Sequence, residues 1–360
     1  MKFGHFCLPT YYEDVYGSVG NHMRRLVDFM AASEDLGFDA LWANEHHFHA
    51  YGGHIPSPPV FLAALAQRTK RVRLGTSIIV MPLHNPIEIA EQMAMVDLMS
   101  GGRVELGVGR GFVVHDHETF GVPVAEGQAR TTEGLEVILK AWTGQPFTHH
   151  GQHFQYENLT VWPKPEQDPH PPVWLACSNN PESFAWTARH GYKLLTVAYV
   201  KPLEKLAGFT DIYRQTWQES GRSMADCEVC THYQVFVHED GQLARERCKQ
   251  ALRRYSELLR ASLQQARDVN EALRQSAAED VDIDKVIDQG RVCAGTPEEC
   301  LGILERAQDQ LGLTIVDCNF LFGGLTYEEA DRSIRLFATE VMPRLKNRLP
   351  SWKGALAGAR

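Results

Sequence analysis

The sequence has no long hydrophobic run and no framework of cysteines. Its apolar-rich stretches, such as residues 72–81, are far shorter than the roughly 18 residues that a membrane-spanning helix requires. The first residues show no charged leader followed by a long apolar segment, so we expect no signal peptide. Eight cysteines are scattered over 360 residues, which favours free thiols in a reducing compartment. We therefore expect a cytoplasmic protein with no membrane partner.

Clustered positive charge is also missing. The formal net charge is −9 at pH 7, and the sequence contains no long Lys/Arg run. A negative surface repels phosphate backbones, which argues against nucleic acid as a partner. The composition, with 44% hydrophobic and 22% charged residues, is ordinary for a globular protein and argues against disorder.

Short apolar runs alternate with helical patterns along most of the chain. In residues 23–31, for example, apolar side chains recur at positions i, i+3, i+4, i+7 and i+8, which is typical of an amphipathic helix. Helices between successive strands produce right-handed crossovers and a parallel sheet. We expect helices to alternate with eight strands, at residues 2–8, 40–43, 72–81, 104–108, 173–177, 193–197, 228–237 and 314–322.

Closure of such a sheet gives an α/β fold of the (β/α)8 TIM barrel type. The doubly wound alternative requires a glycine-rich turn after the first strand, whereas residues 8–12 read Leu-Pro-Thr-Tyr-Tyr. We expect one barrel domain over residues 1–345 and a C-terminal tail at 346–360. Insertions are expected after strands four and seven, as a Pro/His-rich connection at 144–172 and a polar helical segment at about 243–289.

Polar residues gather at the carboxyl ends of the predicted strands, where barrels of this type hold their active sites. Ser178 and the amides before Pro181 precede a predicted helix, where unpaired amides and the helix dipole favour an anion. Arg110 follows the neighbouring strand and adds a planar, permanently charged donor. The pattern predicts a phosphate site, but a helix cap at Ser178 and a local ion pair at Arg110 explain it equally well.

His46 is the candidate for proton transfer, because it follows a glutamate at a strand end. His46 and His47 also suggest a metal site. Adjacent residues of a strand face opposite sides, however, so the two imidazoles cannot easily bind one ion, and we expect no metal. Residues 115–117, His-Asp-His, follow Arg110 closely and could line the mouth of the site.

An ordered series of motifs resembles the bacterial luciferase-like flavin monooxygenases. The series extends over about residues 1–345 and is most similar to the luciferase alpha subunit. The polar stretch at 256–289 falls where that subunit has a mobile active-site loop. The motifs are Lys2-Phe3-Gly4, Gly37-Phe38-Asp39, Glu45-His46-His47-Phe48, Gly75-Thr76, Asn85-Pro86, Ser100-Gly-Gly-Arg103, Gly107-x-Gly109-Arg110-Gly111, residues 295–300 (Gly-Thr-Pro-Glu-Glu-Cys) and Val341-Met342-Pro343.

The resemblance implies a barrel that binds reduced FMN, whose reaction with O2 gives a C4a-hydroperoxyflavin. This species would oxygenate a small organic substrate such as an aldehyde or ketone, and an NAD(P)H:flavin reductase would supply the reduced FMN. By position, the resemblance makes His46 the catalytic imidazole and makes Arg110 and Ser178 the phosphate contacts. The resemblance also implies that five further residues lie along the isoalloxazine ring and ribityl chain: Asn44, Ser77, Ile78, Ala176 and Cys177. The Ser77–Ile78 bond falls where the family has a non-proline cis peptide.

Two positions depart from the luciferase pattern. Gly109 occupies the place of the alpha subunit's reactive cysteine, and Cys177 replaces a carboxylate next to Ser178. Both departures count against light emission and against the luciferase preference for aldehydes. Two alternative functions remain, a deazaflavin (F420)-dependent oxidoreductase of the same superfamily and a non-catalytic flavin-binding subunit. The imidazole of His46 argues against the second alternative.

Two predicted helices, at residues 58–67 and 86–99, are apolar over more than one face. Packing on a barrel requires only one apolar face. We therefore expect a second subunit to cover the excess, as the resemblance also implies. The expected assembly is a homodimer or a heterodimer with a paralogous chain.

Overall fold

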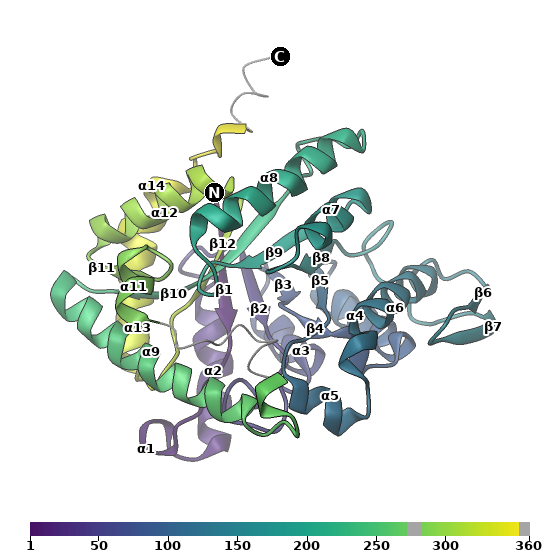
Figure 1. Ribbon diagram of the computed structural model, residues 1–360, viewed down its shortest axis with the longest axis horizontal. Coiled ribbons are helices and arrows are strands. Elements are labelled where there is room, and N and C mark those ends of the chain that lie inside the picture. Colours follow the sequence, from purple (N-terminus) through teal and green to yellow (C-terminus); the bar gives the residue numbers. More distant parts are fainter. Residues whose placement is uncertain (272–281, 353–360) are drawn as a thin grey trace.

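The computed structural model describes residues 1–271 and 282–352. Within these residues, eight parallel strands close into a barrel that is surrounded by helices (Figure 1). Neighbouring strands pair in the order β1, β2, β3, β5, β8, β9, β10, β12, and β12 pairs with β1 to complete the circle. The expected (β/α)8 TIM barrel is confirmed.

The barrel strands have nearly continuous apolar sequences, as is usual for parallel strands that are covered on both faces. Their bounds are β1 Lys2–Cys7, β2 Ala40–Ala43, β3 Arg73–Thr76, β5 Val104–Gly109, β8 Val173–Ala176, β9 Lys193–Val197, β10 Val229–Val237 and β12 Ile315–Asn319. Two short strands are added: β4 (Ile79–Val80) pairs with β5, and β11 (Cys293–Gly295) pairs with β10. The strand predicted at 72–81 is therefore two strands, β3 and β4.

Helices cover the outside of the barrel, and among the described residues no helix is long and apolar enough to cross a bilayer. The helices that follow the barrel strands include α2 Val19–Ala32, α3 Pro58–Arg68, α4 Pro86–Ser100, α6 Gly127–Trp142, α7 Pro181–Arg189, α8 Leu203–Glu219, α12 Pro297–Leu311 and α13 Tyr327–Leu336. Shorter or additional helices are α1 Glu13–Tyr16, α5 Val114–Phe120, α9 Gly241–Leu263, α11 Ile283–Asp288 and α14 Met342–Leu345. Helix α5 and strand β11 have no counterpart among the elements predicted from the sequence.

Extra elements follow the fourth and seventh barrel strands. After β5, the chain forms α5, α6 and a two-stranded hairpin of β6 (Phe147–His150) and β7 (Gln155–Leu159). After β10, the segment predicted at 243–289 begins with α9, which runs toward α5 in Figure 1. Ala266, just beyond α9, packs with Val114 of α5. Parts of this segment (272–281) and of the predicted tail (353–360) lie outside the described residues.

The motif at residues 100–103 has a structural role. Its two glycines have φ angles of 69° and 77°, a left-handed conformation that favours glycine. The buried guanidinium of Arg103 donates to the carbonyl oxygens of Ala66, Thr69 and Val72 at 2.8–3.2 Å. Arg103 thereby fixes the connection between α3 and β3, because several backbone acceptors depend on one side chain.

Candidate active site

The predicted site residues lie at the carboxyl ends of β2, β3, β5 and β8, and α9 passes close to this end of the barrel (Figure 1). The hydroxyl of Tyr255 on α9 is 2.7 Å from the hydroxyl of Tyr51 in the loop after β2. Beyond α9, the amide of Arg267 donates to Glu118 Oε2 of α5 at 2.9 Å. These bonds connect α9 and the residues that follow it to two sides of the barrel mouth.

Small residues line one side of this mouth. A Cβ atom added to Gly109 would lie 2.7 Å from Ile78 Cδ1 and 3.3 Å from Ala176 Cβ. A side chain at this position would clash with Ile78, so the glycine allows the close approach of Ile78 and Ala176 to the end of β5. The Ser77–Ile78 peptide bond is cis, as the resemblance implies. Ser77 and Ile78 are half-buried and Ala176 is exposed, so they form an accessible, largely apolar surface that suits a flat ring system.

Arg110 and the residues after β8 provide a candidate anion site. The guanidinium of Arg110 makes no hydrogen bond or ion pair with any described residue, although its charge acts on Cys177 nearby. Asn180, rather than Ser178, caps α7 by accepting from the Glu182 amide. The amides of residues 178–180 donate no hydrogen bond within the described chain. Neither of the two simpler explanations, a cap at Ser178 or an ion pair at Arg110, therefore matches the structure.

The thiol of Cys177 points toward helix α7. Its Sγ is 3.3 Å from the hydroxyl of Thr187. Burial raises the pKa of Cys177 to about 12, although the bond to Thr187 and the charge of Arg110 partly oppose this shift. The thiol is consequently protonated at neutral pH and packs as a small apolar group.

His46 lies in a buried enclosure of aromatic rings. Its ring centroid is 5.0 Å from that of Tyr51 and 5.6 Å from that of Phe112. Burial lowers the pKa of His46 to about 4, His49 adds to this effect and Asp116 opposes it. At neutral pH the imidazole is uncharged, and it forms no hydrogen bond with the described residues. It can therefore accept a proton from a bound ligand.

Asn44 has a buried carboxamide without a partner. Neither its Oδ1 nor its Nδ2 has a hydrogen bond among the described residues. A Cβ atom on Gly52 would lie 2.9 Å from Asn44 Nδ2 and 2.7 Å from His46 Cδ2, so Asn44 and His46 share one neighbour. Leaving a buried amide unpaired is costly. Its free donor and acceptor are therefore suited to a bound ligand or water.

Glu45 is the hydrogen-bond partner of the neighbouring histidine, His47. Its buried carboxylate accepts hydrogen bonds from His47 Nε2 at 2.9 Å, His84 Nε2 at 2.8 Å and the Val80 amide at 2.9 Å. Burial acts to raise the pKa of Glu45, but these hydrogen bonds outweigh it and lower the pKa to about 2. His46 and His47 thus have different partners, as expected for adjacent residues at a strand end.

Two groups of histidines and carboxylates bring three potential metal-ligand atoms within 4.8 Å of one another. The groups are Glu45 with His47 and His84, and His46 with His49 and Asp116. Hydrogen bonds account for the first group. In the second, His49 Nε2 lies 3.7 Å from Asp116 Oδ1, as in an ion pair. Hydrogen bonds thus explain the first arrangement without an ion, and neither group offers the four protein ligands of a closed zinc site.

Several residues around His46 had no predicted role. Tyr51, His49 and Tyr255 were not singled out, whereas Asp116 belongs to the segment 115–117 that could line the mouth of the site. The buried positions 248, 251, 252 and 255 follow helical spacing, so the sequence does indicate that Tyr255 lies on a buried face. Nothing in this spacing indicates that the face lies beside the barrel mouth.

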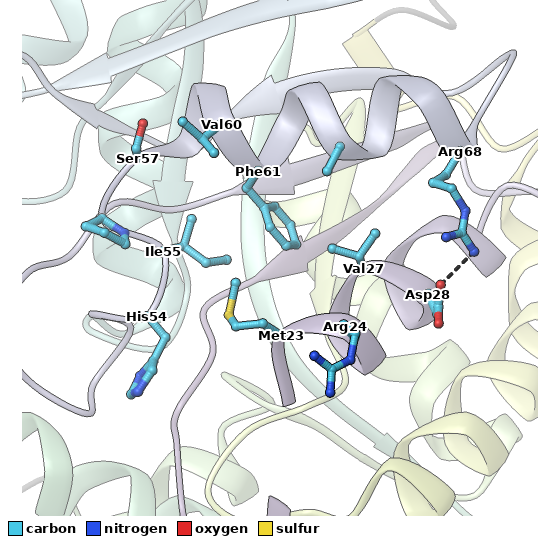
Figure 2. Close-up of a pocket in the computed structure, with 12 residues that line it drawn as sticks. Met23, Arg24, Val27, Asp28, His54, Ile55, Ser57, Val60, Phe61 and Arg68 are labelled. Atoms are coloured by element: carbon cyan, nitrogen blue, oxygen red, sulfur yellow. Dashed lines mark hydrogen bonds and ion pairs between the residues drawn. The ribbon is translucent and has the colours of Figure 1, made fainter. Parts of the chain in front are cut away.

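A separate apolar groove of about 510 Å³ lies outside the barrel, between α2 and α3 (Figure 2). Met23 and Val27 of α2 and Phe61 of α3 line it, and an ion pair of 2.6 Å between Arg68 and Asp28 lies beside it. None of the predicted site residues contributes to its lining. The groove is therefore distinct from the candidate active site.

Comparison with known proteins defines the family. A family model described as luciferase-like monooxygenase matches residues 1–314. The chain belongs to the luciferase-like monooxygenase family. The resemblance found in the motifs is confirmed, and membership of this flavin-dependent superfamily makes the protein an oxidoreductase.

Relatives of this luciferase-like monooxygenase have several names. The alkanal monooxygenase alpha chain of Photorhabdus laumondii is 28% identical over 372 residues, covering 97% of this chain and 99% of the relative. An uncharacterized protein of Sinorhizobium fredii is 38% identical, but that match spans 55% of this chain and only 56% of the relative. The crystal structure of monooxygenase RslO1 from Streptomyces bottropensis has a TM-score of 0.87 and 29% identity, covering 96% of this chain and 99% of that one.

Two more distant structures share the fold alone. The oxygenating constituent of a 3,6-diketocamphane monooxygenase from Pseudomonas putida, in complex with FMN, has a TM-score of 0.78 at 18% identity and covers 97% of this chain and 99% of its own. An F420-dependent secondary alcohol dehydrogenase has a TM-score of 0.75 at 23% identity and covers 95% and 98%. The luciferase-like barrel thus occurs with both kinds of cofactor.

Proposed function

We propose that this protein is a flavin-dependent monooxygenase that uses reduced FMN and O2 to oxygenate a small organic substrate such as an aldehyde or ketone. Bound reduced flavin supplies the oxygen chemistry. The protein has to bind the flavin, exclude water and move a proton. The observation that carries the proposal is the unpaired guanidinium of Arg110 near the free amides of residues 178–180.

Arg110 and these amides would hold the FMN phosphate. A guanidinium binds phosphate through parallel, charge-assisted hydrogen bonds. The amides before α7 add donors at the positive end of the helix dipole. Ser178 would contribute its hydroxyl and backbone, whereas Cys177 would contribute only its backbone because its thiol contacts α7.

The remaining predicted residues would orient the flavin ring system. Ile78, Gly109 and Ala176 offer a shallow apolar surface at three strand ends, and Ser77 lies beside them. The unpartnered carboxamide of Asn44 offers one hydrogen-bond acceptor and one donor pair for polar ring atoms. Such a surface binds a planar ligand by apolar contact and fixes its orientation by a few polar groups.

His46 would move the proton that oxygenation requires. Its uncharged imidazole accepts a proton at a ring nitrogen and can return it to the product. The rings of Tyr51 and Phe112 pack beside this imidazole and would restrict the access of water to it once a ligand is bound. A site depleted of water also protects reactive intermediates from side reactions.

A deazaflavin-dependent oxidoreductase is the second candidate, because an F420-dependent enzyme shares this barrel. The two cofactors can be distinguished by comparing how much each one raises the melting temperature of the protein. A non-catalytic flavin-binding subunit fits less well, since it has no use for the unpaired imidazole of His46. The proposed partners are an NAD(P)H:flavin reductase and a second subunit on α3 and α4.

The proposal is tested by following oxygen atoms. The protein is supplied with FMN, a flavin reductase and NADH under ¹⁸O2, together with a panel of aldehydes and ketones. We expect product that contains one ¹⁸O atom from the gas, as determined by mass spectrometry. Product without label, or hydride transfer from reduced deazaflavin without any O2 consumption, would contradict the proposal and favour the second candidate.

A further inference from the structure

Three side chains with potential metal-ligand atoms lie together beside the barrel mouth: His46, His49 and Asp116. His46 and His49 follow β2, and Asp116 lies on α5. One ligand atom from each residue lies within 4.8 Å of the other two. His49 Nε2 is 3.7 Å from Asp116 Oδ1, which is too long for a hydrogen bond. Two segments of the chain therefore bring two imidazoles and a carboxylate into one small volume.

The facing atoms of this group are buried and have no partner. The side chains of His49 and Asp116 are only 3% and 4% exposed. Both ring nitrogens of His49 and Oδ1 of Asp116 lack a hydrogen bond among the described residues. Buried polar atoms normally have a partner, and each exception calls for an explanation. An ion bound between the three side chains would give these atoms a common partner.

The other group of histidines and carboxylates at this end of the barrel is already occupied by hydrogen bonds. Glu45 Oε1 accepts from His47 Nε2 at 2.9 Å and from His84 Nε2 at 2.8 Å. An ion in that group would have to replace both bonds. The facing atoms of His49 and Asp116 are free, so an ion there breaks no hydrogen bond. The comparison selects the group that contains His49.

We propose that His46, His49 and Asp116 form an open site for one divalent ion of the Zn²⁺ type, and that the bound ion reversibly stops oxygenation by occupying His46. Two imidazoles and a carboxylate suit Zn²⁺, Co²⁺ or Ni²⁺, whereas Mg²⁺ and Ca²⁺ prefer oxygen ligands. Three protein ligands leave one position for water, as in open zinc sites. Coordination displaces any proton from the ligand atoms, so the site does not depend on their protonation state before the ion binds.

The distances fit such an ion after a small adjustment. Metal–ligand bonds of about 2.0–2.2 Å place two ligand atoms at most about 4.4 Å apart. The 3.7 Å between His49 and Asp116 already meets this limit. The ring centroids of His46 and His49 are 5.7 Å apart, so one nitrogen of each ring can face the same ion. Closing the longest separation of 4.8 Å requires a movement of about 0.5 Å.

The surroundings favour reversible binding over a permanent metal centre. Imidazoles in permanent sites donate their second N–H to a carboxylate or carbonyl, and loss of this partner lowers affinity about 10–100-fold. His49 has no such partner among the described residues. A neutral imidazole has a single basic nitrogen, so coordination of His46 leaves no nitrogen that can accept a proton. This inhibitory effect rests on the proposed function of His46.

The site itself is tested without flavin. Protein stripped with EDTA is titrated with Co²⁺, followed by visible absorbance, and with Zn²⁺, followed by calorimetry. We expect one equivalent to bind. His49→Gln and Asp116→Asn should each weaken binding at least about tenfold, since loss of an outer partner alone has an effect of this size. His84→Gln, which belongs to the hydrogen-bonded group, is the control and should leave the affinity unchanged.

The site would be overturned if the wild-type protein bound no ion, or if both folded variants bound it with unchanged affinity. Loss of binding in folded His84→Gln would also overturn it, because the ion would then lie beside Glu45. If neither variant folds, NMR of the wild-type protein decides the question. Zn²⁺ should shift the ring ¹⁵N signals of His46 and His49, and unshifted signals at one equivalent would contradict the site.

Inhibition is measured with chemically reduced FMN, so that no reductase is present. We expect Zn²⁺ to stop product formation in a single turnover and EDTA to restore it. His49→Gln should raise the Zn²⁺ concentration for half-inhibition at least about tenfold. Full activity with the site occupied would overturn the inhibitory role. A wild-type protein that binds no FMN would contradict the proposed function and leave the result of the metal titration valid.

Discussion

The two adjacent histidines show how strongly local surroundings determine the role of a residue. His47 donates from Nε2 to a buried carboxylate, Glu45. His46 has only aromatic and electrostatic neighbours, and burial keeps it uncharged at neutral pH. Both imidazoles come from one motif, yet His47 has a nitrogen committed to Glu45, whereas neither nitrogen of His46 is bonded to a described residue. The two histidines therefore differ in what they can do because their surroundings differ.

Replacement of His46 tests its role at this scale. His46→Gln keeps an amide of similar size but cannot carry a proton at neutral pH. We expect single-turnover product formation to slow by about two to four orders of magnitude, the range for a lost acid–base group. FMN binding should be retained. Unchanged product formation in the variant would exclude His46 as the proton carrier.

Sequence motifs locate some site residues but not their neighbours. His46, Arg110 and Ser178 could be proposed as site residues because each follows a recognisable strand and matches a family position. His49 and Asp116 could not be paired in advance, because they lie on segments 67 residues apart and meet only when the barrel closes. Their juxtaposition depends on loop conformation, which spacing does not determine.

At the scale of elements, the helices that could be predicted are those whose first residues include a capping side chain. Thr296 and Thr326 begin helices with complete capping boxes, in which Glu299 and Glu329 accept from the cap amides. Asn85 caps α4 by accepting from the Ile87 amide, and no capping box is formed there. Helix α5 and strand β11 went unpredicted because they are short and depend on contacts with α9 and β10.

Helix α9 packs on the barrel through a buried apolar face, and one hydrogen bond joins it to the loop beside the candidate active site. The Tyr51–Tyr255 hydroxyl pair at 2.7 Å joins it to the loop that follows His46. Tyr255→Phe removes this buried hydrogen bond and should lower the free energy of unfolding by about 1 kcal/mol. We also expect faster hydrogen exchange in α9. Tyr156→Phe, which loses a hydrogen bond at the surface, is the control, and equal effects of the two substitutions would refute this account of α9.

At the scale of the whole molecule, closure of the barrel explains why the fold was predictable. Eight strands with intervening helices leave few ways to cover every apolar face. Subunit assembly is predicted instead from exposed apolar side chains. Val60 of α3 and Met95, Leu98 and Met99 of α4 are 70%, 51%, 43% and 45% exposed. Exposed apolar side chains on two packed helices favour a partner surface.

Light scattering tests whether this surface of α3 and α4 forms a dimer. At micromolar concentration, we expect twice the chain mass of 40.5 kDa. Met95→Asp should weaken association at least tenfold, because an uncompensated charge in an apolar interface is costly. Ile212→Asp on α8, another partly exposed apolar position, should leave the mass unchanged. A wild-type mass of one chain would contradict the dimer.

The central claim is that Arg110 and the amides of residues 178–180 bind a phosphate. FMN and riboflavin differ only in that group, so anaerobic titration with both reduced flavins tests it most directly. We expect FMN to bind at least tenfold more tightly than riboflavin, and Arg110→Ala to remove most of this difference while leaving riboflavin affinity unchanged, since one charge-assisted hydrogen bond contributes about 1.5–3 kcal/mol. Arg68→Ala, at an exposed ion pair, is the control. Equal affinity of the wild-type protein for both flavins would contradict the claim.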